Sequence, residues 1–191
     1  MPRYVDHDQR RADIVEAAKH VLANGGPAEL TIRSVAKRLG GSITLVTHFY
    51  PTRPELMRAV VTAMNEGYDT ELADLETGAD AHGRLRILLE WMLPLTDQEW
   101  VNESGRVQLL SQRGKDASFE EFANSTDARM RDLLRRHLEP LVPEDRVETY
   151  VDLLRVTVNG IVLAAVEHHD DWPAKRQLAV LEEALTAFDL R

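Results

Sequence analysis

Residues 30–56 read LTIRSVAKRLGGSITLVTHFYPTRPEL, and their spacing predicts two short helices joined by one turn. Thr31 is a good N-cap for a helix that carries apolar residues at i, i+3, i+4 and i+7 and stops at Gly40. After a tight glycine turn, Ser42 can cap a second helix that ends near Tyr50. The pair has the dimensions of a helix-turn-helix, whose second helix is slim enough to enter a major groove of DNA.

The rest of the chain shows helical periodicity and no sustained alternation of the kind that is typical of strands. A first helix is expected at about residues 8–24, and the capping-box spacing of Thr52 and Glu55 predicts a long fourth helix that runs to about residue 76. Five further helices are expected at about residues 80–94, 97–113, 116–140, 144–169 and 173–190. We therefore predict an all-α protein of about nine helices, with a three-helix head at 1–52 and a helical body at 53–191.

Charge is distributed unevenly over the 191 residues, whose formal net charge is −9. Residues 1–56 hold eight Lys and Arg against six Asp and Glu, a net +2, so the remaining 135 residues carry −11. A polyanion such as nucleic acid would therefore meet a mildly basic head, although +2 is also compatible with ordinary charge scatter.

Composition excludes several classes of protein. Cysteine is absent, which rules out disulfides and thiolate metal sites and fits a reducing compartment. The first twenty residues contain no apolar stretch typical of a signal peptide, and no apolar run approaches the ~18 residues of a membrane span. We expect a soluble, cytoplasmic protein that does not bind a membrane.

No motif in the chain indicates an enzyme. There is no glycine-rich phosphate loop, no HExxH, no cysteine nucleophile and no Glu-x-x-His pair of the di-iron type. The run His168–Asp171 holds metal-ligating residue types, but neighbours on a helix end diverge by about 100°, so a polar helix terminus explains it better. We expect no catalytic residue, no metal and no cofactor.

The run from Arg11 to Leu56 resembles the DNA-binding domain of TetR-family transcriptional regulators almost position for position. The matching residues are Arg11, Ile14, Ala17 and Ala18, the whole run 30–40, Ser42, Val46, His48 to Arg53, Glu55 and Leu56. The remainder resembles the family only in being helical and of the right length. The resemblance implies a sequence-specific repressor that binds palindromic double-stranded operator DNA as a homodimer and is released by a small-molecule effector.

Carried over residue by residue, the resemblance assigns phosphate contacts to Thr31 and Arg53 and a base or phosphate contact to Arg33. Cations in the first turn of a helix, such as Arg53, are unfavourable unless an external anion is present, which supports the assignment. The other residues placed along the groove-facing or backbone-facing side are Ser42, Ile43, Thr44, Leu45, Thr47, His48 and Phe49.

Some positions leave alternatives open. Leu45 and Phe49 form an i, i+4 apolar pair that suits either the core or thymine methyl groups. Gly41 departs from the family pattern and loosens the turn, and Thr47 stands where the family commonly has a phosphate-binding Tyr. The alternative function is therefore a helical ligand-binding or protein-interaction module with a degenerate DNA-binding head.

The body supplies candidates for the dimer interface and for the effector pocket. Two apolar stripes on the last two long helices would pair with their copies in the family's dimer, or else fill the chain's own core; the interface candidates are Val158, Ile161, Val162, Ala165, Leu181, Leu185 and Phe188. The pocket candidates, each either cavity lining or plain core, are Trp91, Met92, Trp100, Leu110, Phe122, Met130, Leu134, His137 and the buried-looking Asn159.

Overall fold

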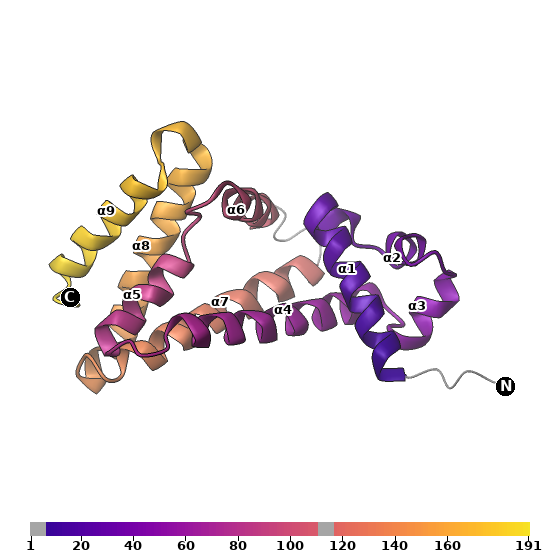
Figure 1. Ribbon diagram of the computed structural model, residues 1–191, viewed down its shortest axis with the longest axis horizontal. Coiled ribbons are helices and arrows are strands. Elements are labelled where there is room, and N and C mark those ends of the chain that lie inside the picture. Colours follow the sequence, from indigo (N-terminus) through magenta and orange to yellow (C-terminus); the bar gives the residue numbers. More distant parts are fainter. Residues whose placement is uncertain (1–6, 111–116) are drawn as a thin grey trace. The chain divides into compact units, whose positions relative to one another are not determined.

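The computed structural model describes residues 7–110 and 117–191, and that part of the chain contains helices and turns but no strand (Figure 1). Its nine α-helices are α1 His7–Glu29, α2 Ile32–Arg38, α3 Ile43–Phe49, α4 Arg53–Leu75, α5 Ala81–Trp91, α6 Asp97–Leu110, α7 Ala117–Leu138, α8 Val147–Glu167 and α9 Ala174–Ala187. Two 3-10 turns, η1 Glu144–Arg146 and η2 His169–Asp171, flank α8. The prediction of an all-α chain of about nine helices is confirmed for these residues.

Helix α1 is longer than the predicted 8–24, because helical structure resumes after an interruption at Gly26. Gly26 has φ 69° and ψ 178°, so two helical pieces meet there at a kink. A side chain at this positive φ would be strained, which is why glycine suits the position.

The chain divides into two compact units, residues 1–69 and 70–191, which we call the first and second units. Helix α4 begins in the first unit and ends in the second. Leu56, Met57 and Val60, near the start of α4, are buried in the core of the first unit beside Ile14 and Val46. The boundary between the two units therefore lies within α4, after residue 69. The sequence pattern predicts a boundary between residues 52 and 53, at the start of that helix.

Helix α8 is central to the second unit, where it packs against α6, α7 and α9 (Figure 1). Arg86 of α5 and Glu182 of α9 form an ion pair across the same unit. Their side-chain hydrogen bond raises the pKa of Arg86 and lowers that of Glu182. Because the carboxylate is favoured in the folded state, its stabilisation is complete above the usual glutamate pKa of 4.5 and is lost as the pH falls through the lowered value.

Most residues predicted for the dimer interface fill this core instead. Val158, Ile161, Val162, Ala165, Leu181 and Leu185 are each at most 3% exposed, and Phe188 is half-buried against them. Side chains already buried within their own chain have no surface left to cover a partner, so the predicted interface is corrected. The exposed large apolar side chains on α8 and α9 are Leu153, Val156, Leu163 and Val180.

One helical stretch in the described ranges, Glu144–Glu167, is long and apolar enough to cross a membrane when judged by length and composition alone. Its mean hydropathy reaches 1.4, whereas the sequence was expected to hold no such run. Val151, Leu154 and Ile161 within it are buried in the core of the second unit. Such burial is typical of a core helix, and it explains the apolar residues on the inward face of α8.

Candidate functional site

The turn between α2 and α3 is closed by two backbone hydrogen bonds. The Gly41 N–H donates to the Ala36 carbonyl (3.0 Å) and the Gly40 N–H to the Lys37 carbonyl (3.1 Å), which is the pattern of a Schellman motif. Gly40 has φ 63°, a conformation that glycine adopts without strain. A Cβ on Gly41 would lie 2.8 Å from Cδ2 of Leu45, so this glycine lets Leu45 pack closely on the turn. The expectation that Gly41 loosens the turn is therefore wrong.

Capping boxes fix the starts of α2 and α4. The Ser34 N–H donates to Thr31 Oγ1 and the Thr31 N–H donates to Ser34 Oγ, both at 3.0 Å. The Thr52 N–H donates to Glu55 Oε2 (3.0 Å), and the Glu55 N–H donates to Thr52 Oγ1 (3.4 Å). The predicted box at 52–55 is confirmed. The box at 31–34 was not predicted, because Ser34 replaces the Glu or Gln that usually stands three residues after the cap.

Helix α3 buries one face and exposes the other. Its cap is Ser42, whose Oγ accepts the Leu45 N–H at 3.2 Å, and the predicted inward residues Val46 and Tyr50 are buried. Four of the residues expected to face DNA form the exposed row of α3: Ser42, Ile43, Thr44 and His48. Leu45 and Thr47 are half-buried beside this row. The exposed row therefore offers hydroxyls, an imidazole and the 45% exposed side chain of Ile43, which suits a thymine methyl group.

Phe49 does not lie on this surface. It is 9% exposed, its ring meets that of His48 edge-on with centroids 4.9 Å apart, and the His7 ring lies 5.7 Å away. The Arg11 guanidinium stands 5.6 Å from the Phe49 centroid, within cation–π range. Phe49 is thus a packing residue that connects the start of α1 to the end of α3, and its assignment as a DNA contact is corrected. No pattern in the sequence predicted the contact of His7 with Phe49.

The two arginines expected to contact DNA differ in their surroundings. Arg33 is exposed in the first turn of α2 and makes no hydrogen bond or ion pair with the residues that the structure describes. A cation at a helix N-terminus is unfavourable without an anion, so Arg33 is suited to an external phosphate or base. Arg53 is half-buried, and its Nε donates to the Leu30 carbonyl at 2.7 Å. Arg53 therefore joins the start of α4 to the residue before the Thr31 cap, a role that the resemblance does not imply.

The candidates for the effector pocket do not gather around one cavity. Trp100 of α6 donates from Nε1 to the Ala165 carbonyl (3.0 Å) near the end of α8, whereas His137 lies at the end of α7, just before the connection into the start of α8. The 21 residues of α8 span about 30 Å at 1.5 Å per residue, so Trp100 and His137 lie near opposite ends of that helix.

The other pocket candidates have mixed positions. Trp91, Met92 and Met130 are half-buried against the second core, and Leu134 is fully buried within it. Asn159 is exposed on α8, so the expectation that it is buried is wrong. The side chains of Leu110 and Phe122 lie outside the described residues.

Comparison with known proteins identifies relatives of both the sequence and the fold. The family model for the C-terminal domain of BetI-type transcriptional repressors, a TetR-type domain, matches residues 81–189. The HTH-type transcriptional regulator PksA of Bacillus subtilis (strain 168) is 30% identical over 105 residues, which are 54% of this chain and 50% of PksA. The chain thus spans about half the length of this curated relative.

Solved structures of transcriptional regulators share the fold over nearly the whole chain. A regulator from Rhodococcus sp. Rha1 superposes with a TM-score of 0.73 at 23% identity, covering 93% of this chain and 94% of that one. A regulator from Saccharomonospora viridis in complex with choline superposes with a TM-score of 0.70 at 19% identity, covering 94% of this chain and 96% of that one. At these identities the likeness establishes the fold alone.

Proposed function

Because the chain belongs to the TetR family of transcriptional regulators and carries a BetI-type C-terminal domain, we propose that it represses promoters by binding a palindromic operator as a homodimer. This family comprises DNA-binding regulators rather than enzymes. The observation that carries the proposal is the exposed row of α3, held on a capped helix-turn-helix, together with the exposed Arg33 at the start of α2, which has no partner within the described ranges.

In the proposed complex α3 lies in the major groove. Ile43, Thr44 and His48 face base edges there, and Thr31, at the N-terminus of α2, faces a phosphate. The mildly basic first 56 residues and the acidic remainder support this orientation on a polyanion. Half-buried Thr47 reaches a phosphate with a shorter arm than tyrosine has.

The homodimer forms, in this proposal, through the exposed apolar stripe of α8, which consists of Leu153, Val156, Gly160 and Leu163. Their spacing of three or four residues keeps them on one face of the helix. Nothing within the chain lies within 4 Å of a Cβ on Gly160, so a second helix can approach closely at this point. Val180 of α9 is a further exposed apolar side chain of this unit, and binding to a palindrome requires the two copies of α3 to lie about 34 Å apart, one turn of DNA.

A small molecule bound in the second unit is proposed to release the operator. The BetI-type match and the choline complex of the Saccharomonospora viridis regulator support an organic effector. Because α4 belongs to both units, an effector that favours another position of α4 changes the spacing of the two heads. The proposed site of action is the cytoplasm.

The test is a fluorescence-anisotropy titration of DNA flanking the protein's own gene, repeated across salt concentrations with wild type and Arg33→Ala. We expect saturable binding to a palindrome that weakens steeply with salt, because each phosphate contact releases counterions. If Arg33 contacts a phosphate, its loss weakens binding to all sequences and reduces the salt slope by about one. If it contacts a base, its loss costs about 1–3 kcal/mol and relaxes specificity at one position.

Lys19→Ala is the matched control, since it removes an exposed cation of α1 that pairs with Glu16 at 2.7 Å. Normal operator binding by Arg33→Ala would contradict the role of that residue. Binding no tighter to any palindrome than to random DNA, even after selection from a random library, would favour the alternative, a ligand-binding or interaction module with a degenerate head.

Arg53→Lys separates the two roles open to Arg53. Lysine keeps the positive charge but lacks the Nε–H that is directed at the Leu30 carbonyl. If the contact with Leu30 positions the start of α2, Arg53→Lys loses operator affinity by about tenfold, close to the loss in Arg53→Ala. If charge alone matters, the lysine variant binds as wild type does, and the positioning role is wrong. Anisotropy with both variants, with circular dichroism as a check on folding, makes the comparison.

A further inference from the structure

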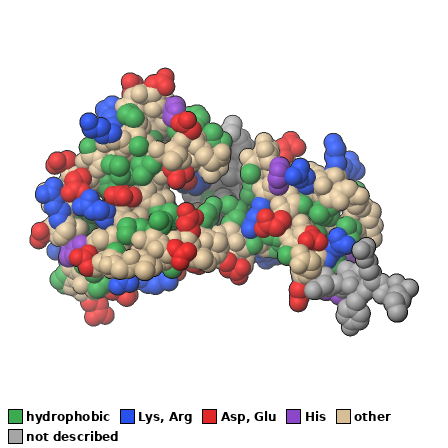
Figure 2. All heavy atoms as spheres, in the orientation of Figure 1, with side chains coloured by type: hydrophobic (Ala, Val, Ile, Leu, Met, Phe, Trp, Pro, Cys, Tyr) green, Lys and Arg blue, Asp and Glu red, His purple; other side chains and the backbone are tan. Residues whose placement is uncertain are grey.

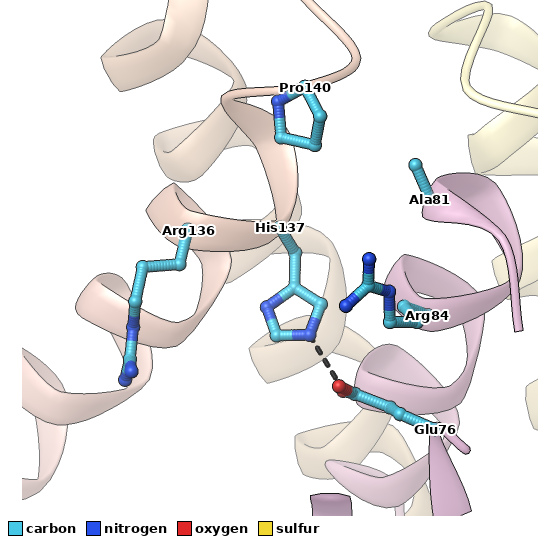
Figure 3. A pocket seen from close by; sticks show the side chains of 6 residues that line it. All are labelled: Glu76, Ala81, Arg84, Arg136, His137 and Pro140. Atoms are coloured by element: carbon cyan, nitrogen blue, oxygen red, sulfur yellow. Dashed lines mark hydrogen bonds and ion pairs between the residues drawn. The ribbon is translucent and has the colours of Figure 1, made fainter. Parts of the chain in front are cut away.

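The second unit contains a polar pocket that the proposed function does not use. Its volume is about 160 Å³. It lies between the residue that follows α4, the start of α5 and the end of α7 (Figure 3). Glu76, Ala81, Arg84, Arg136, His137 and Pro140 line it. Drug-sized ligands occupy about 300–1,000 Å³, so this pocket fits a smaller molecule than an organic effector.

A hydrogen-bonded pair forms one wall of the pocket. His137 Nε2 lies 2.7 Å from Glu76 Oε1, and His137 Nδ1 lies 2.7 Å from the Leu133 carbonyl oxygen. The carbonyl can only accept, so Nδ1 carries a proton and donates to it. Nε2 and Glu76 then share one proton, either as imidazolium and carboxylate or as imidazole and carboxylic acid. In both cases the net charge of His137 and Glu76 together is zero, so the pair adds no net charge to the pocket.

The remaining charge of the pocket is positive. In Figure 3 the Arg84 guanidinium stands beside the His137 ring, while the Arg136 side chain, which also lines the pocket, extends away from that ring. The Arg84 side chain makes no hydrogen bond or ion pair with the part of the chain that the structure describes. Arg136 donates from Nε to the Asp132 carbonyl (3.3 Å), and no ion pair with a described carboxylate is found for it. Neither cation therefore has a counterion among the described residues.

Elsewhere in the described part of the second unit most arginines have a carboxylate partner, whereas Arg146 and Arg176 lie over the rings of Tyr150 and Trp172. Six pair with carboxylates: Arg86, Arg106, Arg131, Arg135, Arg155 and Arg191. On the face that Figure 2 shows, acidic and basic side chains are interspersed over this unit. Two uncompensated guanidinium groups around one hollow, in a chain of net charge −9, are thus a local excess of positive charge.

We propose that this pocket binds a small oxyanion with the chemistry of phosphate. Arg84 supplies the planar, paired N–H donors that suit such an anion, the imidazolium form of His137 supplies a third donor from Nε2, and Arg136 adds to the positive potential. In the absence of the anion the Glu76 carboxylate is hydrogen-bonded to His137 Nε2. Glu76 and the anion therefore compete for the same donor. Since Glu76 directly follows α4 and His137 belongs to α7, occupancy of the pocket removes the hydrogen bond between these two segments.

The test measures binding of inorganic phosphate to the full-length protein by isothermal titration calorimetry, without DNA, so that it does not depend on the proposed repressor activity. Chloride at matched ionic strength separates specific binding from screening. We expect saturable binding of phosphate only, about tenfold weaker in Arg84→Ala and several-fold tighter in Glu76→Gln, which removes the competing charge.

Lys175→Ala removes an exposed cation of α9 that does not line the pocket, and it should bind phosphate as wild type does. Arg84 is exposed, so Arg84→Ala should fold normally and its result stands even if Glu76→Gln is destabilised. No saturable binding by wild type, or equal binding by wild type and Arg84→Ala, would overturn the proposal.

Discussion

Replacement of Val156 by aspartate is expected to convert the proposed homodimer into a monomer and to lower operator affinity at least about a hundredfold. Val156 is 73% exposed within its own chain, and in the proposed homodimer it lies within the apolar stripe of α8. A two-fold symmetric interface receives the substitution twice, so two carboxylates are desolvated without partners. A monomer binds only one half-site and loses the gain in effective concentration that a linked second head provides.

Val101→Asp is the matched control, because Val101 of α6 is a 52% exposed valine outside the proposed interface. Light scattering coupled to size-exclusion chromatography gives the molecular mass of each variant, and anisotropy gives its operator affinity. We expect Val101→Asp to remain dimeric and to bind normally. A dimeric Val156→Asp with wild-type affinity would place the interface on another surface, and circular dichroism shows whether both variants are folded.

The local features of the first unit could be predicted because their causes lie within a few residues of one another. The cap at Ser42 and the box between Thr52 and Glu55 depend on a side chain that reaches a backbone group three residues away, and sequence spacing alone specifies such contacts. The positive φ of Gly40 likewise follows from the turn that the chain must make there. These elements match their predicted positions closely.

The inward face of α8 could not be predicted, because the helix is apolar on both sides. Leu154 and Val158 are buried in the chain, while Leu153 and Val156, one or two positions away, are exposed. Periodicity identifies the inward face of a helix only where the opposite face is polar. On α8 the opposite face also carries large apolar side chains, Leu153, Val156 and Leu163. The interface candidates chosen from the sequence were therefore core residues, and the exposed stripe was missed.

Contacts between distant residues left no signal in a single sequence. The Arg53 contact with the Leu30 carbonyl joins positions 23 residues apart, and the contact between His137 and Glu76 joins positions 61 apart. Each depends on the packing of whole helices. His137 was expected among the effector-pocket residues, and the structure pairs it with Glu76 at the end of α7.

Replacement of Leu56 by alanine is expected to cost the first unit about 2–5 kcal/mol of unfolding free energy, because a fully buried side chain leaves a cavity behind. Leu56 is 0% exposed and packs with Ile14 and Val46 in a core separate from that of the second unit. The substitution should therefore lower the unfolding temperature of residues 1–69 by roughly 10 °C or more and leave the transition of residues 70–191 in place. Operator binding should fall with it, since α3 keeps its position only while that core is intact.

Leu75→Ala makes the same chemical change on the same helix at a side chain that is 53% exposed, so it should shift neither transition by more than about 0.5 kcal/mol. Differential scanning calorimetry of wild type and both variants, with hydrogen exchange of amides in α1 and in α8, assigns each transition to its unit. Equal losses in the two variants would mean that Leu56 is not a core residue. A single transition that shifts as a whole in Leu56→Ala would mean that the two cores unfold together, and α4, which belongs to both units, would then be the element that couples them.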